Sequence, residues 1–280
     1  MRWADLDMLG HVNNVVYVDY LQEARVDMFR VHAPDSRADD LAEGVVVVRH
    51  EVGYRTPLTF RFRPVQIETW VTEIRAASFT LAYEVFDEDA DGERTVYLRA
   101  STVLTPYVFA TECPRRLSPD EKQVLEQFLE PAERRPIGSW TPVAESVDGH
   151  YPLQVRFSDV DVYRHVNNVR YFEYLQESRI LFATHLSRGL DTTAELQMVV
   201  AQTDVDYLVP MLLRPEPYDV WSRVAHVGRT SYVVESEIRD GGTVMARARV
   251  VCVFFDPVTQ RATEPPPEYA ERLRAALPSS

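Results

Sequence analysis

Alternation of apolar and polar side chains marks several stretches of the first half of the chain as strands. In residues 65–72, 79–85 and 96–104, every second side chain is largely apolar. This is the period of a strand with one buried face. The run Val45–Val48 indicates a further short strand. Turns rich in Asp and Gly, which tolerate positive φ, predict a hairpin between the last two strands of each half. They are Asp89-Ala90-Asp91-Gly92 and Asp240-Gly241-Gly242.

Ahead of the strands, apolar or small side chains recur at helical spacing on one face of the chain. They are Tyr17, Tyr20, Leu21, Ala24 and Met28 in the first half, and Tyr171, Tyr174, Leu175, Ser178 and Phe182 in the second. Short amphipathic helices are predicted near Ser118–Leu129 and Glu268–Leu277. The first begins with the pattern of a capping box, in which Ser118 is followed by Glu121 at the third helical position.

The chain repeats itself. Residues 2–25 align without a gap to residues 156–179, and 14 of the 24 positions are identical. A looser match continues through the strands, so two related halves are predicted. We expect a first domain over residues 1–130, a Pro-rich linker over 131–149 and a second domain over 150–280.

The opening of the first domain is shorter than that of the second. Only Met1 precedes Arg2, whereas residues 150–155 precede the equivalent Arg156. We therefore expect a truncated opening strand in the first domain. Either the true start lies upstream, or this half tolerates the shorter strand.

Each half is predicted to be an α+β unit, because a long helix with an apolar stripe precedes an antiparallel meander with one apolar face. A sheet that curls around the helix buries both surfaces.

Composition narrows the function. The net charge of −13 argues against nucleic-acid binding, which needs a basic surface. No apolar run approaches the roughly 18 residues of a membrane span, and no signal segment is evident, so we expect a cytoplasmic protein. Cys113 and Cys252 match neither a metal site nor a disulfide framework, and Cys252 is expected in the core.

An anionic substrate would need local arginines. Candidates are Arg61, Arg63, Arg75, Arg223 and Arg229, although each taken alone is typical of a surface charge.

Each half carries Asp-x-Asp-x-x-x-His-Val-Asn-Asn directly before the helix. The residues are Asp5, Asp7, His11, Asn13 and Asn14, and Asp159, Asp161, His165, Asn167 and Asn168. Free N–H groups at a helix N-terminus stabilise the negative charge that develops on a thioester oxygen under attack. A neighbouring carboxylate could activate water or attack directly.

Other interpretations of this motif remain open. Asn or Asp before a helix is often only a cap, and Asn13 and Asn167 could be retained for folding alone. The spacing fits neither a zinc site nor a calcium loop, so we expect no metal. The chain has no Gly-x-Ser-x-Gly elbow and no Gly-x-Gly-x-x-Gly run, and we expect no cofactor. His50 has no counterpart in the second half, and the helix tyrosines are interpreted as packing residues.

The motif, extended to Arg-Trp-x-Asp-x-Asp-x-x-x-His-Val-Asn-Asn-x-x-Tyr-x-x-Tyr, resembles the 4-hydroxybenzoyl-CoA and acyl-CoA thioesterase family. The layout also resembles plant acyl-ACP thioesterases, which carry two hotdog domains in one chain. The resemblance implies two tandem hotdog domains, each a long central helix wrapped by an antiparallel sheet, that pair as an internal pseudo-dimer. We leave open whether the chain associates further into a homo-oligomer.

The resemblance also implies roles for residues. Asp7 and Asp161 become the catalytic carboxylates, supported by His11 and His165. Backbone N–H groups near Asn14 and Asn168 would hold the thioester oxygen, and Asn13 and Asn167 are counted among the substrate-binding residues. The plant enzymes carry Asn two residues before the His, where this chain has Leu9 and Tyr163.

The sequence therefore predicts a thioesterase that acts on acyl-CoA or acyl-carrier-protein thioesters. A hydratase or dehydratase acting on an acyl thioester is a second hypothesis, but no second motif for that chemistry is evident. A non-catalytic acyl-CoA binder is the third. Such a binder could lose its carboxylates freely, whereas both halves keep them.

Overall fold

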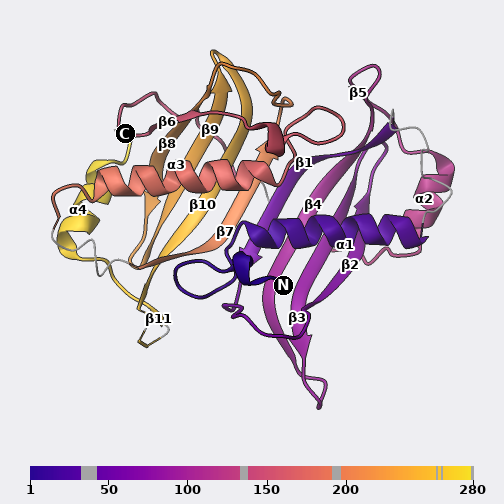
Figure 1. Ribbon diagram of the computed structural model, residues 1–280, viewed down its shortest axis with the longest axis horizontal. Helices are drawn as coiled ribbons and strands as arrows, with labels where there is room; N and C mark the ends of the chain where they lie inside the picture. The colour runs from indigo at the N-terminus through magenta and orange to yellow at the C-terminus, as the bar shows by residue number, and fades with distance from the viewer. Residues whose placement is uncertain (33–42, 133–137, 191–196, 257, 260, 279–280) are drawn as a thin grey trace. The chain divides into compact units, whose positions relative to one another are not determined.

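The computed structural model describes residues 1–32, 43–132, 138–190, 197–256, 258–259 and 261–278 (Figure 1). The chain divides into two compact units, Met1–Gly138 and Ser139–Ser280. Each unit contains one long helix that lies across an antiparallel sheet (Figure 1). No helix in the described ranges is long and apolar enough to cross a lipid bilayer.

The first unit forms its sheet in the order β2-β3-β4-β1. The stretches of alternating apolar residues are confirmed as β2, β3 and β4, and the apolar run at Val45 lies within the longer β1. The elements are η1 (Trp3–Asp5), α1 (Val16–His32), β1 (Glu43–Tyr54), β2 (Gln66–Ile74), β3 (Phe79–Glu88), β4 (Arg94–Val108), β5 (Cys113–Pro114) and α2 (Pro119–Glu126). The predicted capping box at Ser118 and Glu121 is also confirmed.

The second unit repeats this plan with the strand order β7-β10-β9-β8-β6. Both predicted hairpins are confirmed, with Gly92 and Gly241 at positive φ in the turns. The elements are β6 (His150–Leu153), η3 (Phe157–Asp159), α3 (Arg170–Leu186), β7 (Met198–Tyr207), β8 (Tyr218–Val227), β9 (Ser231–Asp240), β10 (Thr243–Asp256), β11 (Arg261–Ala262) and α4 (Pro267–Ala275).

The two long helices bury their faces differently. On α3 all five predicted residues are buried. On α1 only Tyr17 and Leu21 of the predicted face are buried, and Arg25 takes the place expected for Ala24. Arg25 is 6% exposed, and its guanidinium lies 3.5 Å from the Tyr83 hydroxyl. In the first half, the hydrophobic period therefore predicted where the helix lies but did not predict all of the residues on its buried face.

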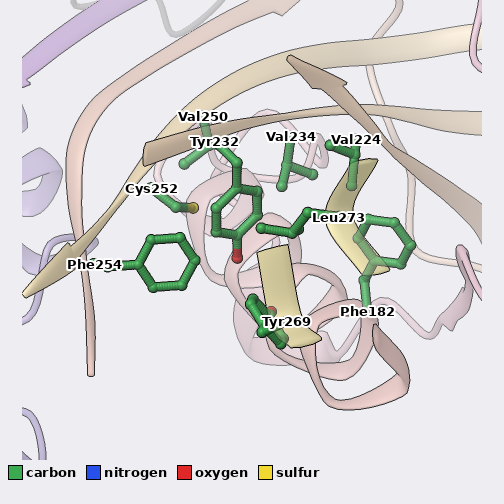
Figure 2. Close-up of a cluster of buried hydrophobic side chains, with 9 residues drawn as sticks. All are labelled: Phe182, Val224, Tyr232, Val234, Val250, Cys252, Phe254, Tyr269 and Leu273. Carbon is green, nitrogen blue, oxygen red and sulfur yellow. The ribbon is translucent and has the colours of Figure 1, made fainter. Parts of the chain in front are cut away.

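The second unit has its apolar core where α3 and α4 meet the inner face of the sheet (Figure 2). Phe182 from α3 and Tyr269 and Leu273 from α4 contact side chains of β8, β9 and β10. Cys252 is fully buried in this cluster, as expected of a small core residue, and burial raises the pKa of its thiol. A thiol in this environment is inert.

The end of the segment assigned to the linker packs on the second unit. Arg249 and Arg223 donate to the carbonyl oxygens of Ser139 (2.9 Å) and Thr141 (3.0 Å), respectively. The Trp140 ring N–H donates to a buried glutamate on β9 at 2.6 Å. Arginines on two strands thus satisfy alternate carbonyls of an extended segment. Gly138 and Pro142 are described, whereas Pro136 lies outside the described residues.

Candidate active site

The repeated motif folds the same way in both units, as a short 3-10 helix, a tight turn and then the long helix. The turn closes when the Asp7 N–H donates to the His11 carbonyl at 2.8 Å and the Gly10 N–H donates back to Asp7 at 3.1 Å. The same two bonds in the second unit, from Asp161 and Arg164, measure 2.9 and 3.0 Å. The turn therefore brings each catalytic candidate into one loop with its histidine.

The first aspartate of each motif is a buried anchor. Asp5 is 1% exposed and accepts hydrogen bonds from the backbone and side chain of Arg2 and from the Tyr20 hydroxyl at 2.6 Å. Burial raises the pKa of Asp5, but the hydrogen bonds from Tyr20 and Arg2 outweigh that effect and leave it below its usual range. This carboxylate ties the 3-10 helix to the second turn of α1.

The second unit repeats the anchor. Asp159 is 2% exposed and accepts from Arg156 and from the Tyr174 hydroxyl at 2.6 Å. Burial again raises the pKa of Asp159, and the hydrogen bonds from Arg156 and Tyr174 reverse the shift. Each carboxylate is fully engaged with its own unit, which leaves it structural rather than reactive.

The second aspartate of each motif is held by one oxygen only. Oδ1 of Asp7 accepts the N–H groups of Leu9 (2.8 Å) and His11 (3.2 Å). Oδ1 of Asp161 accepts those of Tyr163 (2.9 Å) and His165 (3.3 Å). Within the described residues, Oδ2 of neither carboxylate accepts a hydrogen bond. The side chain is thus oriented through one oxygen, and the other remains available to a substrate or to water.

Burial raises the pKa of Asp161, against the opposing effects of the Tyr163 and His165 N–H groups and the charge of His165. A partly buried carboxylate with a raised pKa is a better proton acceptor than an exposed one. The side chains at Leu9 and Tyr163, where the plant enzymes carry Asn, differ in kind. Both positions nevertheless supply the same backbone N–H to the aspartate.

The two asparagines have different contacts. Asn13 Oδ1 accepts the Val15 N–H at 3.1 Å, and Asn167 Oδ1 accepts the Val169 N–H at 3.0 Å. Both side chains thus act as caps at the start of the helix, which is the structural alternative left open by the sequence. Asn14 instead interacts through its backbone, because its carbonyl oxygen accepts a hydrogen bond from the Tyr54 hydroxyl at 2.8 Å. The Asn14 N–H donates to no described residue.

The loop that follows the first long strand of each unit is hydrogen-bonded to the turn that carries the motif. The Val12 N–H donates to the Leu58 carbonyl at 2.8 Å, and the Val166 N–H donates to Met211 at 2.9 Å. Leu58 and Met211 are buried, and the Tyr171 hydroxyl accepts the Met211 N–H at 3.2 Å. Burial raises the pKa of Tyr171, so this phenol stays neutral.

Sequence reasoning did not identify the partners that orient this site. Arg2, Tyr20 and Tyr54 carry out the anchoring described above, and each has an identical residue in the second half. The Tyr207 hydroxyl, for example, donates to the Asn168 carbonyl at 2.9 Å, as Tyr54 does to Asn14. Identity across the repeat was therefore the available signal. Tyr20 and Tyr174 bind the anchoring aspartates rather than serving only as packing residues.

The five arginines considered for phosphate binding already have carboxylate partners. Within the described residues they pair with Asp87 (Arg61 and Arg63), Glu73 (Arg75), Glu235 (Arg223) and Glu264 (Arg229). Also among the described residues, no three His, Cys, Asp or Glu side chains lie together as a metal site would require.

A family model described as the thioesterase-like superfamily matches residues 1–128 and again residues 155–273. The chain belongs to the thioesterase-like superfamily. The long-chain acyl-CoA thioesterase FadM of Escherichia coli K12 is 29% identical over 131 residues, which cover 43% of this chain and 93% of FadM. The family match and the similarity to FadM support the conclusion that this chain is a thioester hydrolase.

Solved thioesterase structures share the fold over nearly the whole chain. The putative oleoyl thioesterase of Lactobacillus plantarum superposes with a TM-score of 0.72 at 16% identity, covering 91% of this chain and 94% of that one. The 12:0-ACP thioesterase of Umbellularia californica gives 0.71 at 16% identity, covering 89% and 93%. At this level of identity the likeness establishes the tandem hotdog fold.

The turn also yields a stability prediction. Arg164 has a φ of +66° where the first unit has Gly10 at +76°. A left-handed conformation costs a non-glycine residue about 1–2 kcal/mol, and glycine loses roughly 0.5–1 kcal/mol through its greater freedom when unfolded. Arg164→Gly should therefore raise the free energy of unfolding by about 0.5–1 kcal/mol in urea denaturation. Gly10→Ala should lower the free energy of unfolding. If both variants unfold at the same urea concentration as the wild type, the left-handed backbone at these two positions carries no energetic cost, and the prediction is wrong.

Proposed function

We propose that this chain hydrolyses acyl thioesters of coenzyme A or of an acyl carrier protein, with Asp7 and Asp161 as catalytic carboxylates. The observation that carries the proposal is the difference between the two aspartates of each motif. The first is buried and fully hydrogen-bonded, whereas the second is held through Oδ1 with Oδ2 available. Both halves keep this arrangement.

The chemistry requires a base or nucleophile next to a site for the oxyanion. As general base, Oδ2 of Asp161 takes a proton from water while the water oxygen attacks the thioester carbon. As nucleophile, the same oxygen attacks the carbon, and water then hydrolyses the resulting anhydride. In both routes the C–S bond breaks and its electron pair leaves with the sulfur. The proton that water gives up passes to the departing thiolate, which is released as the thiol, while the acyl group leaves as the acid and the Asp161 carboxylate is regenerated.

The N-terminus of the long helix is suited to stabilise the negative charge that develops during the reaction. The positive end of the helix dipole and the backbone N–H groups near Asn14 and Asn168 are suited to stabilise the negative charge on the thioester oxygen. Asn13 and Asn167 support this by fixing the first turn of the helix. His11 and His165, in the same turn as the carboxylates, are suited to orient water or thioester.

Thiol release from a panel of acyl-CoA and acyl-carrier-protein substrates of increasing chain length tests the function. A coloured thiol reagent reports the product continuously. We expect turnover that rises above the spontaneous rate for at least one chain length and stoichiometric free acid by mass spectrometry. Tight binding of the same substrates without thiol release would instead identify an acyl-thioester binder.

A further inference from the structure

The two copies of the catalytic turn differ at one conformationally costly position. Gly10 in the first unit and Arg164 in the second have the same left-handed backbone and make equivalent hydrogen bonds. A Cβ placed on Gly10 would meet no atom within 4 Å, so the turn has room for a side chain. Only the backbone conformation opposes one, and it favours glycine. The second unit therefore keeps an arginine at a position where the fold prefers none.

The Arg164 guanidinium forms no hydrogen bond or ion pair with the part of the chain that the structure describes. Nearby arginines of the second unit form ion pairs, as Arg156 does with Asp159, Arg170 with Glu173 and Arg214 with Asp240. Arg164 is exposed and forms no ion pair with any described residue. A left-handed backbone that presents an exposed, unpaired cation in the same turn as a candidate catalytic carboxylate points to a ligand of that cation.

We propose that Arg164 binds the phosphate of the phosphopantetheine arm that delivers the acyl group to Asp161. This inference rests on the proposed function. Coenzyme A and acyl carrier proteins both present the thioester at the end of this arm, so an anion must lie outside the carboxylate on the solvent side. Arg164 is three residues from Asp161 and one from His165. Its planar fork suits a phosphate.

The charge of the protein favours such a contact. With a net charge of −13, the chain as a whole repels an anionic carrier. A local arginine at the entrance offsets that repulsion where the substrate binds. Gly10 supplies no charge, so the second site is expected to bind phosphorylated carriers more tightly than the first.

The test compares one acyl group on three carriers: coenzyme A, phosphopantetheine and pantetheine without phosphate. The background is Asp7→Asn, which isolates the second site. Arg164→Gly should raise KM about tenfold for the first two substrates, equivalent to about 1.4 kcal/mol, with kcat within twofold. KM for the pantetheine thioester should not change. Arg164→Lys should retain most of the affinity, because it keeps the charge.

Arg188→Gly is the matched control, since it removes one exposed cation beyond the other end of α3, about 25 Å away along the helix. An equal rise in KM for the pantetheine thioester would overturn the inference, as would an effect of Arg188→Gly as large as that of Arg164→Gly. An effect on coenzyme A alone would also overturn it, because the shared phosphate would not be the ligand.

Calorimetric titration with free coenzyme A separates this inference from the proposed function. A protein that hydrolyses no thioester but binds coenzyme A about tenfold more weakly after Arg164→Gly would refute the hydrolase and retain the phosphate contact. The same variant is expected to be more stable than the wild type, so weaker binding could not be attributed to unfolding.

Discussion

Exchange of both Asp7 and Asp161 for asparagine is expected to lower kcat for thiol release by about 10³-fold, within the range that a positioned proton acceptor contributes. Asparagine keeps the Oδ1 that accepts the turn's N–H groups, so the loop should hold its shape. It removes the basicity and nucleophilicity of Oδ2. Each single variant then measures the share of its own site, and the assay is thiol release under saturating substrate.

The stability of these variants is the control. Burial raises the pKa of Asp161, so folding favours its protonated form. The contribution of this group to stability is present at low pH and is lost as the pH rises through its folded pKa. Asp161→Asn should therefore be as stable as the wild type at neutral pH, or slightly more stable. Wild-type turnover in the folded double variant would show that neither carboxylate takes part in the reaction.

The pH profile gives an independent readout. If Asp161 acts ionised, kcat/KM of the Asp7→Asn variant should fall as the pH drops through the pKa of Asp161. That limb should lie above the range of an ordinary aspartate, because burial disfavours the charged form.

The fold was largely predictable because hydrophobic periods are local properties of the sequence and the repeat can be read directly from it. Period-two stretches became β2, β3 and β4, and the helical face of α3 was predicted completely. The buried Arg25 on α1 was missed, since its burial depends on Tyr83, which lies 58 positions later in the chain. Periodicity cannot report a contact between distant elements.

The site was predictable as a motif, but the roles of its two aspartates were assigned only through the family resemblance. Asp5 and Asp7 are the same residue type and are both repeated, so nothing in the local sequence separates their roles. The physical difference comes from Tyr20 on α1, which binds Asp5 from 15 residues away. Among the described residues, the hydrogen bonds to the Asp7 side chain come from backbone N–H groups of its own turn. The ion pairs of most candidate phosphate arginines could not be predicted either, because partners such as Asp87, Glu235 and Glu264 lie 12 to 35 positions away in the chain.

Asp159, the buried aspartate that anchors the 3-10 helix, should make a large contribution to the free energy of unfolding. Asp159→Asn is expected to lower the free energy of unfolding by roughly 2–4 kcal/mol, because hydrogen bonds to a charged group contribute about 1.5–3 kcal/mol each. The bonds from Tyr174 and Arg156 converge on this one buried carboxylate. Arg156 is itself 60% exposed, which places its ion pair at the weak end of the range. Urea unfolding monitored by tryptophan fluorescence provides the measurement.

Its pH dependence has the opposite sign to that of Asp161. The folded pKa of Asp159 is lowered, so its contribution is complete above the unfolded value of about 3.9 and disappears as the pH falls through the folded pKa. Wild type and Asp159→Asn should therefore differ by a constant amount from pH 5 to 8 and converge below about pH 4. Tyr174→Phe, which removes one bond and keeps the charge, should cost less. A difference between wild type and Asp159→Asn that persists undiminished at pH 3 would assign the loss to packing rather than to the charge, and the carboxylate would then be an anchor by shape alone.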